Sequence, residues 1–439
     1  MIKPITVRRL LHWLADRPAA AAVLFVLAAG ERVAWTLSGH VAYPDTELRN
    51  AASTWAATGW VADAFRSGSG PTAHVGALPP IIPGSVFALF GPNPPTSTVL
   101  LTVLSSCVIV TTALVLNRVF AKLGTPATFR GAAIALICLL PLHLELEARS
   151  LRVYENGYAA LALALTLLAV VRLDVRQTVG VADILGLSAF TTVTVALSPP
   201  VGICAIVMLG ILAMRRLDWW RRCGAAVVLA TALFATTLPW ALRNQAVLGE
   251  MVWTRGSFGL EFAIGTHAGA VAPADPAATY LARLAQVHPH GSDPAYRAMQ
   301  SAGGELPYAH KLGDQTWRWV SAHPMQAVMI WLRHLREFFF PPPWLWHHTA
   351  LPDATMPFRI VIVNVIAALA LVGLLGALAR RQWLFLYMLP PVLVLPLPYL
   401  LAQPLVRYRY VIASLLIFLA ADWLGRLTGQ GQGALKKST

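Results

Sequence analysis

The sequence predicts an α-helical polytopic membrane protein with about ten transmembrane helices. Of its 439 residues, 57% are hydrophobic and only 12% are charged, whereas soluble domains carry roughly 25% charged residues. Apolar stretches close to the ~20 residues that cross a bilayer recur along the chain. The net charge of +14 therefore indicates orientation in a membrane rather than nucleic-acid binding, because short cytoplasmic loops collect Lys and Arg.

The first apolar stretch follows basic N-terminal residues without a convincing cleavage site. We interpret Ala19–Leu37 as a retained signal anchor. The stretch 78–91, LPPIIPGSVFALFG, is too short and too rich in proline to span, which predicts a re-entrant or interfacial segment. The predicted spans cover residues 18–38, 97–120, 130–147, 157–172, 181–197, 200–214, 224–242, 359–379, 382–401 and 409–426.

Ten spans place both termini on one side of the membrane. The segments on that side hold 18 Lys and Arg residues against Asp16, Asp174 and Asp218, so we expect it to be cytoplasmic. The first loop and the long loop then face outward, into the periplasm of a bacterial inner membrane or its equivalent. The four cysteines lie in or beside apolar spans, and no disulfide framework is predicted.

Three regions follow from this topology: a transmembrane core over 1–242 with its first outer loop at 39–96, an extracytoplasmic region over 243–357, and C-terminal spans with a tail over 358–439. Alternating apolar residues and glycines at the start of the long loop predict a short strand or extended hairpin. Helices are expected near 294–302 and 308–322. The loop ends in MQAVMIWLRHLREFFFPPPWLWHH, whose mixture of aromatics and Arg predicts an interfacial helix.

Two acidic residues, Asp45 and Glu47, follow the first span directly. Asp45 comes after Pro44 and suits a helix N-cap, with Gly59 ending the helix. Capping alone would explain Asp45. A catalytic role is compatible with it, because the positive end of a helix favours the carboxylate form that a general base requires.

A second group of charges lies at 143–156, HLELEARSLRVYEN, on the outer side of the membrane. Glu145 and Arg149, and likewise Arg152 and Glu155, have the spacing of helical salt bridges. The alternative is that these residues contact an anionic head group. The sequence leaves both interpretations open.

Further arginines lie at the outer ends of two spans. Arg243, beyond Trp240, and Arg255 are explained by anchoring at the membrane interface or by ligand contact. Arg407 and Arg409 open the last span from the outer side, where the distribution of charge disfavours Arg. A phosphate is their natural ligand.

The long loop is rich in histidine. His288 and His290, or the pair His347 and His348, could bind a metal, but their spacing matches no known site, so surface or interfacial histidines are the favoured interpretation. No metal ligand is assigned, although a divalent ion would be compatible with the chain. The sequence contains no P-loop and no GxGxxG, HExxH or GxSxG signature.

Several elements occur in an order that covers most of the chain. They are Arg32 near the end of the first span, Pro44–Glu47 before a helix, Pro79–Pro80 with FALFG, Glu155 opening the fourth span, PWALRN at 239–244, HPMQAV at 323–328 and RYRYVI at 407–412. Together they resemble the GT-C superfamily of integral-membrane glycosyltransferases. The resemblance is to family 39, which includes protein O-mannosyltransferases and lipid A aminoarabinose transferases.

The resemblance implies a GT-C fold with juxtamembrane helices in the first outer loop and a large outer loop before the last three spans. It implies transfer of a sugar from a polyprenyl-phosphate-linked donor to a lipid, glycan or protein acceptor on the outer face. Asp45 would be catalytic, and Arg407 and Arg409 would bind phosphate. The chain departs from the family in reading PDTE instead of an adjacent acid pair, which leaves the role of Glu47 open. It also has Leu78 where aminoarabinose transferases place Lys before the double proline.

Polyprenyl phosphate is a good leaving group, so the reaction needs a base more than an acid and favours inversion in a single displacement. The candidate catalytic residues are Asp45 and Glu47. The candidate substrate- or phosphate-binding residues are Arg149, Arg152, Glu155, Arg243, Arg255, Arg407 and Arg409.

Two other functions remain open. A transporter or flippase of lipid-linked sugars predicts ionisable residues in the middle of spans, but Asp183 and Asp422 fall near span ends. An O-antigen ligase or polymerase also has a large outer loop and outer arginines. The acid that follows the first span favours the family 39 interpretation.

Overall fold

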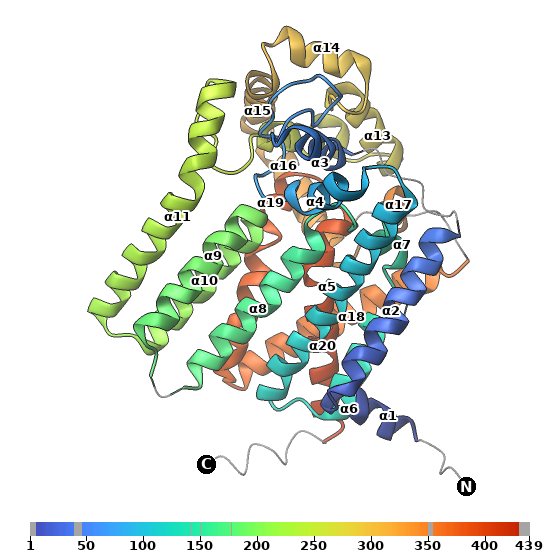
Figure 1. Ribbon diagram of the computed structural model, residues 1–439, viewed down its shortest axis with the longest axis vertical. Helices are drawn as coiled ribbons and strands as arrows, with labels where there is room; N and C mark the ends of the chain where they lie inside the picture. Colours follow the sequence, from blue (N-terminus) through green and yellow to red (C-terminus); the bar gives the residue numbers. More distant parts are fainter. Residues whose placement is uncertain are drawn as a thin grey trace.

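The computed structural model describes residues 6–38, 46–140, 142–149, 151–176, 178–349 and 354–429. Over these residues the chain is helical, and the only β pairing is an isolated bridge between Ala62 and Pro71. The helices form a bundle with a layer of shorter helices at one end (Figure 1). We call this layer the cap.

The bundle contains the long apolar helices. Eight helical stretches in the described part of the chain are long and apolar enough to cross a membrane. They are α2 (Ala19–Leu37), α5 (Pro95–Lys122), α8 (Asn156–Asp174), α10 (Pro199–Arg216), α11 (Trp219–Leu248), α18 (Met356–Ala379), the stretch Trp383–Leu401 and α20 (Val406–Leu427). Two shorter apolar helices, α6 (Ala127–Cys138) and α9 (Val181–Leu197), lie in the same bundle. The predicted polytopic helical fold is confirmed, while the count of about ten spans stays a prediction.

Two predicted spans differ from the observed helices. The span expected at 130–147 ends at Cys138, ahead of Pro141, and the short helix α7 (Leu144–Arg149) follows separately. The span expected at 382–401 is divided because its prolines remove backbone donors from the helical ladder. Its three pieces are η2 (Trp383–Met388), η3 (Pro390–Val394) and α19 (Leu397–Leu401).

The cap is built from the two outer regions of the sequence. Its elements are α3 (Glu47–Thr58), α4 (Ile81–Phe90), α12 (Phe258–Gly265), η1 (Ala268–Ala270), α13 (Pro276–Val287), α14 (Asp293–Ser301), α15 (Glu305–Ala322), α16 (Pro324–Phe339) and α17 (Pro343–Thr349). The helices expected near 294–302 and 308–322 are therefore confirmed. The expected strand or hairpin is wrong, because α11 continues as a helix until Gly249, whose φ of 79° ends it.

The first outer loop carries α3, and its cap differs from the prediction. Thr46 is the N-cap, with its side chain accepting a hydrogen bond from the backbone N–H of Arg49 at 3.2 Å. Asp45, which we expected in that position, lies outside the described residues. Gly59 ends the helix with a φ of 77°, as predicted. The stretch predicted to be re-entrant or interfacial contains the 10-residue helix α4, beside α3 at the top of the bundle (Figure 1).

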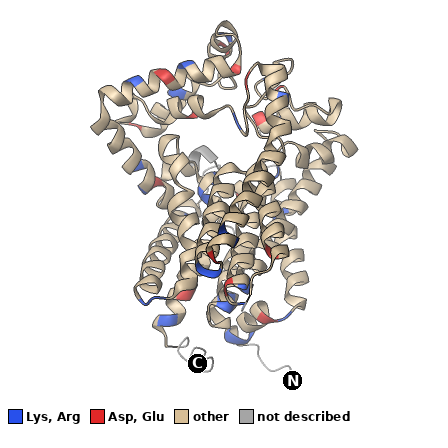
Figure 2. Ribbon diagram, turned by 90° about the vertical axis from the view of Figure 1, so that its left-hand side faces the viewer, with Lys and Arg blue, Asp and Glu red and all other residues tan. Residues whose placement is uncertain are grey.

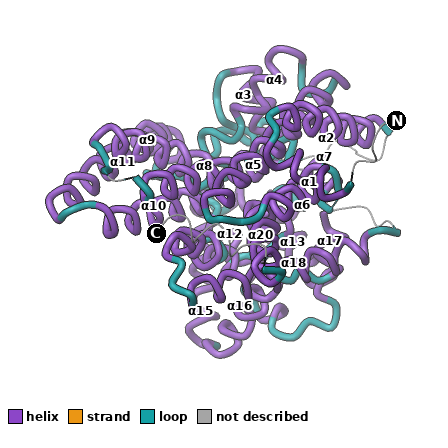
Figure 3. Tube along the Cα trace, turned by 90° about the horizontal axis from the view of Figure 1, so that it is seen from below, coloured by secondary structure: helices purple, strands orange, loops and turns teal. Residues whose placement is uncertain are grey.

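The two ends of the bundle differ in charge. Basic segments mark the lower ends of the helices, near α1 (Val7–Asp16) and opposite the cap (Figure 2). Seen from below, α9, α10 and α11 form one flank and α1, α2 and α6 the other (Figure 3). Within α11 only Ala241 and Asn244 are buried, so most of this apolar helix faces outward, as a lipid-facing helix does.

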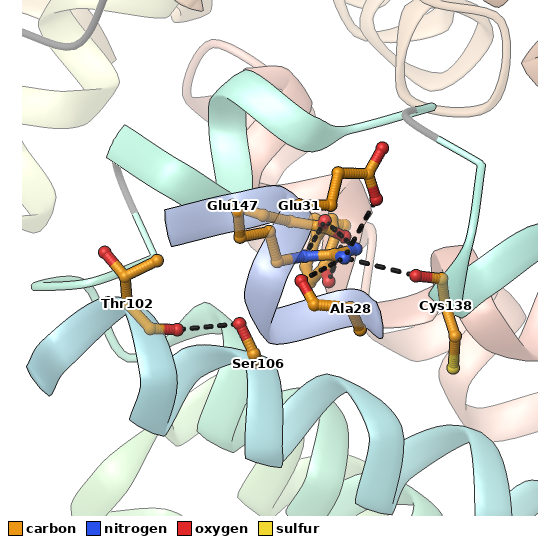
Figure 4. Close-up of polar contacts among 8 residues, drawn as sticks. Ala28, Glu31, Thr102, Ser106, Cys138 and Glu147 are labelled. Carbon is orange, nitrogen blue, oxygen red and sulfur yellow. Dashed lines mark hydrogen bonds and ion pairs between the residues drawn. The ribbon is translucent and has the colours of Figure 1, made fainter. Parts of the chain in front are cut away.

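A buried ion pair joins α2 to α7 (Leu144–Arg149) at the end of the bundle that faces the cap. Arg32 in α2 is 1% exposed, and its Nε donates to Glu147 of α7 at 2.9 Å. Its Nη1 donates to the carbonyl oxygens of Ala28 and Cys138, each at 3.2 Å. Figure 4 shows how Glu147, Ala28 and Cys138 are arranged around these hydrogen bonds, with Glu31 alongside at 3.5 Å from Arg32.

Glu147 has a second partner on the last helix. The hydroxyl of Tyr410 in α20 donates to the other carboxylate oxygen of Glu147 at 2.8 Å. The pair thus connects α2, α6, α7 and α20. Tyr154 and Glu155 follow α7 within a few residues, so the ion pair that holds α7 also restricts the positions of these two residues.

Replacing Glu147 by Gln should destabilise the protein, because buried Arg32 would lose its closest counter-charge and keep only the partly exposed Glu31 at 3.5 Å. Breaking one partner of a buried pair costs about 3–5 kcal/mol, so we expect a clearly lower melting temperature in detergent. The double variant Arg32→Met/Glu147→Met should melt above the single variant, since it buries no unpaired charge. Glu250→Gln is the matched control, because the Glu250 side chain is 48% exposed. A Glu147→Gln protein that melts with the wild type would contradict this role.

Candidate functional site

Side chains from distant parts of the sequence meet where the cap joins the bundle. We call them the central cluster, which consists of Glu47 in the first turn of α3, His74 in the first outer loop, Tyr154 and Glu155 before α8, Arg255 and Glu261 around α12, His288 after α13, and Arg407 and Tyr408 in the first turn of α20. Four residues predicted from the sequence, Glu47, Glu155, Arg255 and Arg407, belong to it.

Glu47 has one hydrogen-bond donor and one imidazole beside its carboxylate. The Tyr154 hydroxyl donates to one carboxylate oxygen at 3.2 Å, and Nε2 of His288 lies 3.3 Å from the other. Burial alone would raise the pKa of Glu47, but His288, His74 and His290 lower it to about 2. Glu47 is therefore ionised at neutral pH.

His74 is a neutral member of the cluster. Its ring packs against Phe65 at 4.8 Å and His288 at 5.7 Å between centroids. Burial, the largest cause, lowers its pKa to about 3, although Glu47 acts in the opposite direction. Glu305 holds the preceding backbone in place by accepting hydrogen bonds from the Thr72 hydroxyl at 2.7 Å and from the backbone N–H of Ala73.

Arg243 lies outside the central cluster and fixes the same loop. Its guanidinium donates to the carbonyl oxygens of Thr72, at 2.9 Å, and of Val61. It also lies over the ring of Trp240, 4.8 Å from the centroid. These contacts give Arg243 a structural role in the first outer loop, while anchoring at the membrane interface stays a prediction.

Glu155 pairs with Arg255 instead of Arg152. The expected pairing required one helix over residues 152–155, but α7 ends at Arg149 and α8 begins only at Asn156. Arg255 donates to Glu155, and although burial lowers the pKa of Arg255, the Glu155 carboxylate raises it overall. Arg152 is buried at 2% exposure, and the side chain of Arg149 lies outside the described part.

Arg407 is a cation stacked between two aromatic rings. Its guanidinium lies 4.3 Å from the Tyr154 ring centroid and 4.9 Å from that of Tyr408, and it donates to the Tyr408 hydroxyl at 2.9 Å. Among the described residues no carboxylate forms an ion pair with it, and its buried Nε has no hydrogen-bond partner. Arg407 is therefore available to an anion.

Arg409 is not brought to the cluster. Two residues along a helix place a side chain on roughly the opposite face. Its guanidinium accordingly donates to the carbonyl oxygens of Phe339 and Val363, each at 3.3 Å. These bonds join α20 to the end of α16 and to α18.

Glu261 is the carboxylate of the cluster that the sequence analysis did not select. The sequence feature that could have identified Glu261 is its position as the one acid within the apolar run SFGLEFAIG. The groups acting on its charge are His288, Arg407, Glu47 and Arg255, and desolvation, the largest cause, raises its pKa. The cluster therefore contains three carboxylates: Glu47, Glu155 and Glu261.

Three of these side chains are close enough to be considered as metal ligands. Glu47, His74 and His288 each offer a ligand atom, all within 4.8 Å of one another, and two His with one Glu is a donor set used for zinc. However, Nδ1 of His288 accepts a hydrogen bond from the backbone N–H of His290 at 3.2 Å. The accepting Nδ1 leaves Nε2 of His288 as the atom that faces the Glu47 carboxylate, at 3.3 Å. We assign no metal to these three side chains.

Comparison with known proteins gives structural similarity only. No family model and no curated protein matches the chain. The archaeal oligosaccharyltransferase AglB from Archaeoglobus fulgidus, in complex with an inhibitory peptide and a dolichol-phosphate, is similar over 95% of this chain at 12% identity and a TM-score of 0.47. This chain spans about half of AglB, 51% of its length.

ArnT from Cupriavidus metallidurans is similar in two states. Bound to undecaprenyl phosphate it matches 95% of this chain and 78% of its own, at 17% identity and a TM-score of 0.35. The apo state matches 93% and 78%, at 16% identity and a TM-score of 0.36. The similarity is too distant to assign a function, which must come from the cluster itself.

Acid should destabilise the cap through His74. Since its folded pKa of about 3 lies below the ordinary 6.5, the unfolded chain takes up the proton first. The stabilisation is complete above about pH 6.5 and is lost as the pH falls toward 3. The melting temperature of His74→Phe should therefore fall less between about pH 7.5 and 4.5 than that of the wild type.

His310→Phe serves as the control for this experiment, because the His310 side chain is 59% exposed. It should follow the wild-type pH dependence. Equal acid sensitivity in His74→Phe and the wild type would contradict a buried neutral His74.

Proposed function

We propose that the protein transfers a sugar from a polyprenyl-phosphate-linked donor to a lipid, glycan or protein acceptor on the extracytoplasmic face of the membrane. The observation that carries this proposal is Arg407, a cation without a carboxylate partner among the described residues, in the first turn of α20. An anion that binds Arg407 must place its charged group at the end of the apolar bundle, next to the cap.

A phosphate on a long apolar chain meets this requirement. Its tail would remain among lipid, while its oxygens accept hydrogen bonds from the planar guanidinium. Tyr154 and Tyr408 orient that guanidinium from both sides. Arg255 adds a second cation, shared with Glu155.

The chemistry is a displacement at the anomeric carbon. The acceptor oxygen forms the new bond, the bond to the donor phosphate breaks, and Arg407 stabilises the charge that develops on the leaving phosphate. Asp45 is the candidate to take the acceptor proton, or to position groups where the acceptor is itself a phosphate. A single displacement would invert the sugar.

The direction of the reaction in the membrane follows from charge. Basic residues near the lower helix ends, such as Lys122, Arg172 and Arg215, support a cytoplasmic location for that side. The cap and the central cluster would then face the periplasm or its equivalent, with both termini in the cytoplasm.

A transporter is less well supported. Ionisable groups along a transport path lie in the middle of spans. Here the pair of Asp174 with Arg215, at 3.0 Å, and that of Asp422 with Arg426, at 2.6 Å, lie near the lower helix ends. Arg32 and Glu147 pair near the cap.

Arg407→Ala should weaken binding of undecaprenyl phosphate to the purified protein. Losing charge-assisted hydrogen bonds worth about 1.5–3 kcal/mol corresponds to roughly 10- to 150-fold in Kd, measurable by microscale thermophoresis. Arg407→Lys should bind with intermediate affinity, because it keeps the charge without the planar fork. Arg66→Ala is the control, since Arg66 pairs with Asp293 outside the cluster. Wild-type affinity in Arg407→Ala would exclude this phosphate site.

Asp45→Asn should insert normally and bind undecaprenyl phosphate, yet fail to restore the glycan of a deletion strain. Losing a carboxylate that deprotonates or positions the acceptor lowers the rate by about 10²- to 10⁴-fold. The measurement is the carbohydrate profile of the strain complemented with the wild type or the variant at equal membrane levels. Full restoration by Asp45→Asn would remove Asp45 from the mechanism.

A further inference from the structure

Glu261 is an acid within an otherwise apolar helix of the cap. Its neighbours Leu260, Phe262, Ala263 and Ile264 are buried, whereas Glu261 is half-buried. Among the described residues its carboxylate forms no hydrogen bond or ion pair. A desolvated carboxylate kept without a donor is costly, so its presence requires an explanation.

Close backbone packing fixes the position of this side chain. A Cβ atom at Gly259 would lie 2.0 Å from the carbonyl oxygen of Ala309 in α15, and one at Gly265 would lie 2.4 Å from the carbonyl carbon of Ala402 after α19. Only glycine permits these approaches. They hold α12 at both ends, so Glu261 cannot move away from the cluster without moving the helix.

The three carboxylates of the cluster differ in what binds them. Glu47 has Tyr154 and His288, and Glu155 has Arg255. Hydrogen bonds and ion pairs to a carboxylate make it a weaker base. Among the described residues Glu261 has neither, so its carboxylate is free to accept a proton, and desolvation raises its pKa.

We propose that Glu261 is the general base of the transfer reaction, receiving the proton of the acceptor hydroxyl. This inference rests on the proposed function, but it assigns to Glu261 the proton transfer for which Asp45 was the candidate from the sequence, so that Asp45 positions the acceptor. Glu261 is suited to the task by its free carboxylate, its fixed helix and its place near Arg407, which would hold the donor phosphate.

With an acceptor hydroxyl, the transfer is a single displacement coupled to one proton transfer. The O–H proton passes to a carboxylate oxygen of Glu261 while the acceptor oxygen bonds to the anomeric carbon. The bond between that carbon and the phosphate oxygen breaks, and its electron pair remains on the polyprenyl phosphate. Because Glu261 is half-buried and not sealed, the proton can then leave to solvent.

The test compares Glu261→Gln, Glu261→Asp and wild type as full-length purified proteins. Transfer from a panel of undecaprenyl-phosphate hexoses and pentoses into host membranes is followed by release of undecaprenyl phosphate. We expect Glu261→Gln to lose about 10²- to 10⁴-fold in kcat while binding undecaprenyl phosphate within about twofold of wild type. Glu250→Gln, an exposed acid of the cap, is the matched control and should keep full activity.

The pH profile separates a base from a structural residue. The wild-type rate should rise with pH as Glu261 loses its proton, Glu261→Asp should keep this acidic limb at a lower rate, and Glu261→Gln should lack it. An unchanged limb in Glu261→Gln, or a loss of activity matched by a loss of undecaprenyl phosphate binding, would overturn the inference. A wild type that neither transfers from any donor nor binds undecaprenyl phosphate would instead overturn the proposed function.

Discussion

The buried pair of Arg32 and Glu147 is the interaction on which the rest of the arrangement depends. Desolvating two charges is compensated only when the geometry is good and the remaining donors and acceptors are satisfied. Here the carbonyl oxygens of Ala28 and Cys138 and the hydroxyl of Tyr410 meet that condition. The pair therefore specifies position: it sets the segment after α7 and the rotation of α20 together, and these two elements deliver Glu155 and Arg407 to one place.

The same requirement explains why Arg407 stands out. Other arginines of this region have acceptors within the protein, such as Arg409 on two carbonyl oxygens and Arg243 on Thr72 and Val61. Arg407 has two tyrosine rings and one hydroxyl, which orient the guanidinium but do not neutralise it. Aromatic stacking is thus a means of fixing a cation while leaving its charge available to a ligand.

Composition and periodicity were sufficient for the helical membrane fold, because crossing a bilayer demands a long apolar run wherever it occurs. They failed where local chemistry intervenes, as at the prolines of 390–398 and at Thr46, which caps α3 instead of Asp45. Composition and periodicity could not predict the partners of charged residues. Glu155 pairs with Arg255, and helical spacing carries no information on contacts between residues 100 apart in the sequence. Glu261 could have been found, since an acid inside an apolar helix needs a reason.

The central cluster contains some charged side chains that are paired within the protein and others that are not, and this difference has a chemical consequence. Where every group is paired, as for Glu47 and Glu155, the protein itself supplies the stabilisation and a ligand gains little. Arg407 and Glu261 are held in place but have no ion-pair partner among the described residues, so each gains from a substrate that brings the complementary group. A phosphate for Arg407 and a hydroxyl for Glu261 are such groups. Under the proposed function, this cluster is therefore complementary to a displacement in which an acceptor hydroxyl replaces a phosphate leaving group at one carbon.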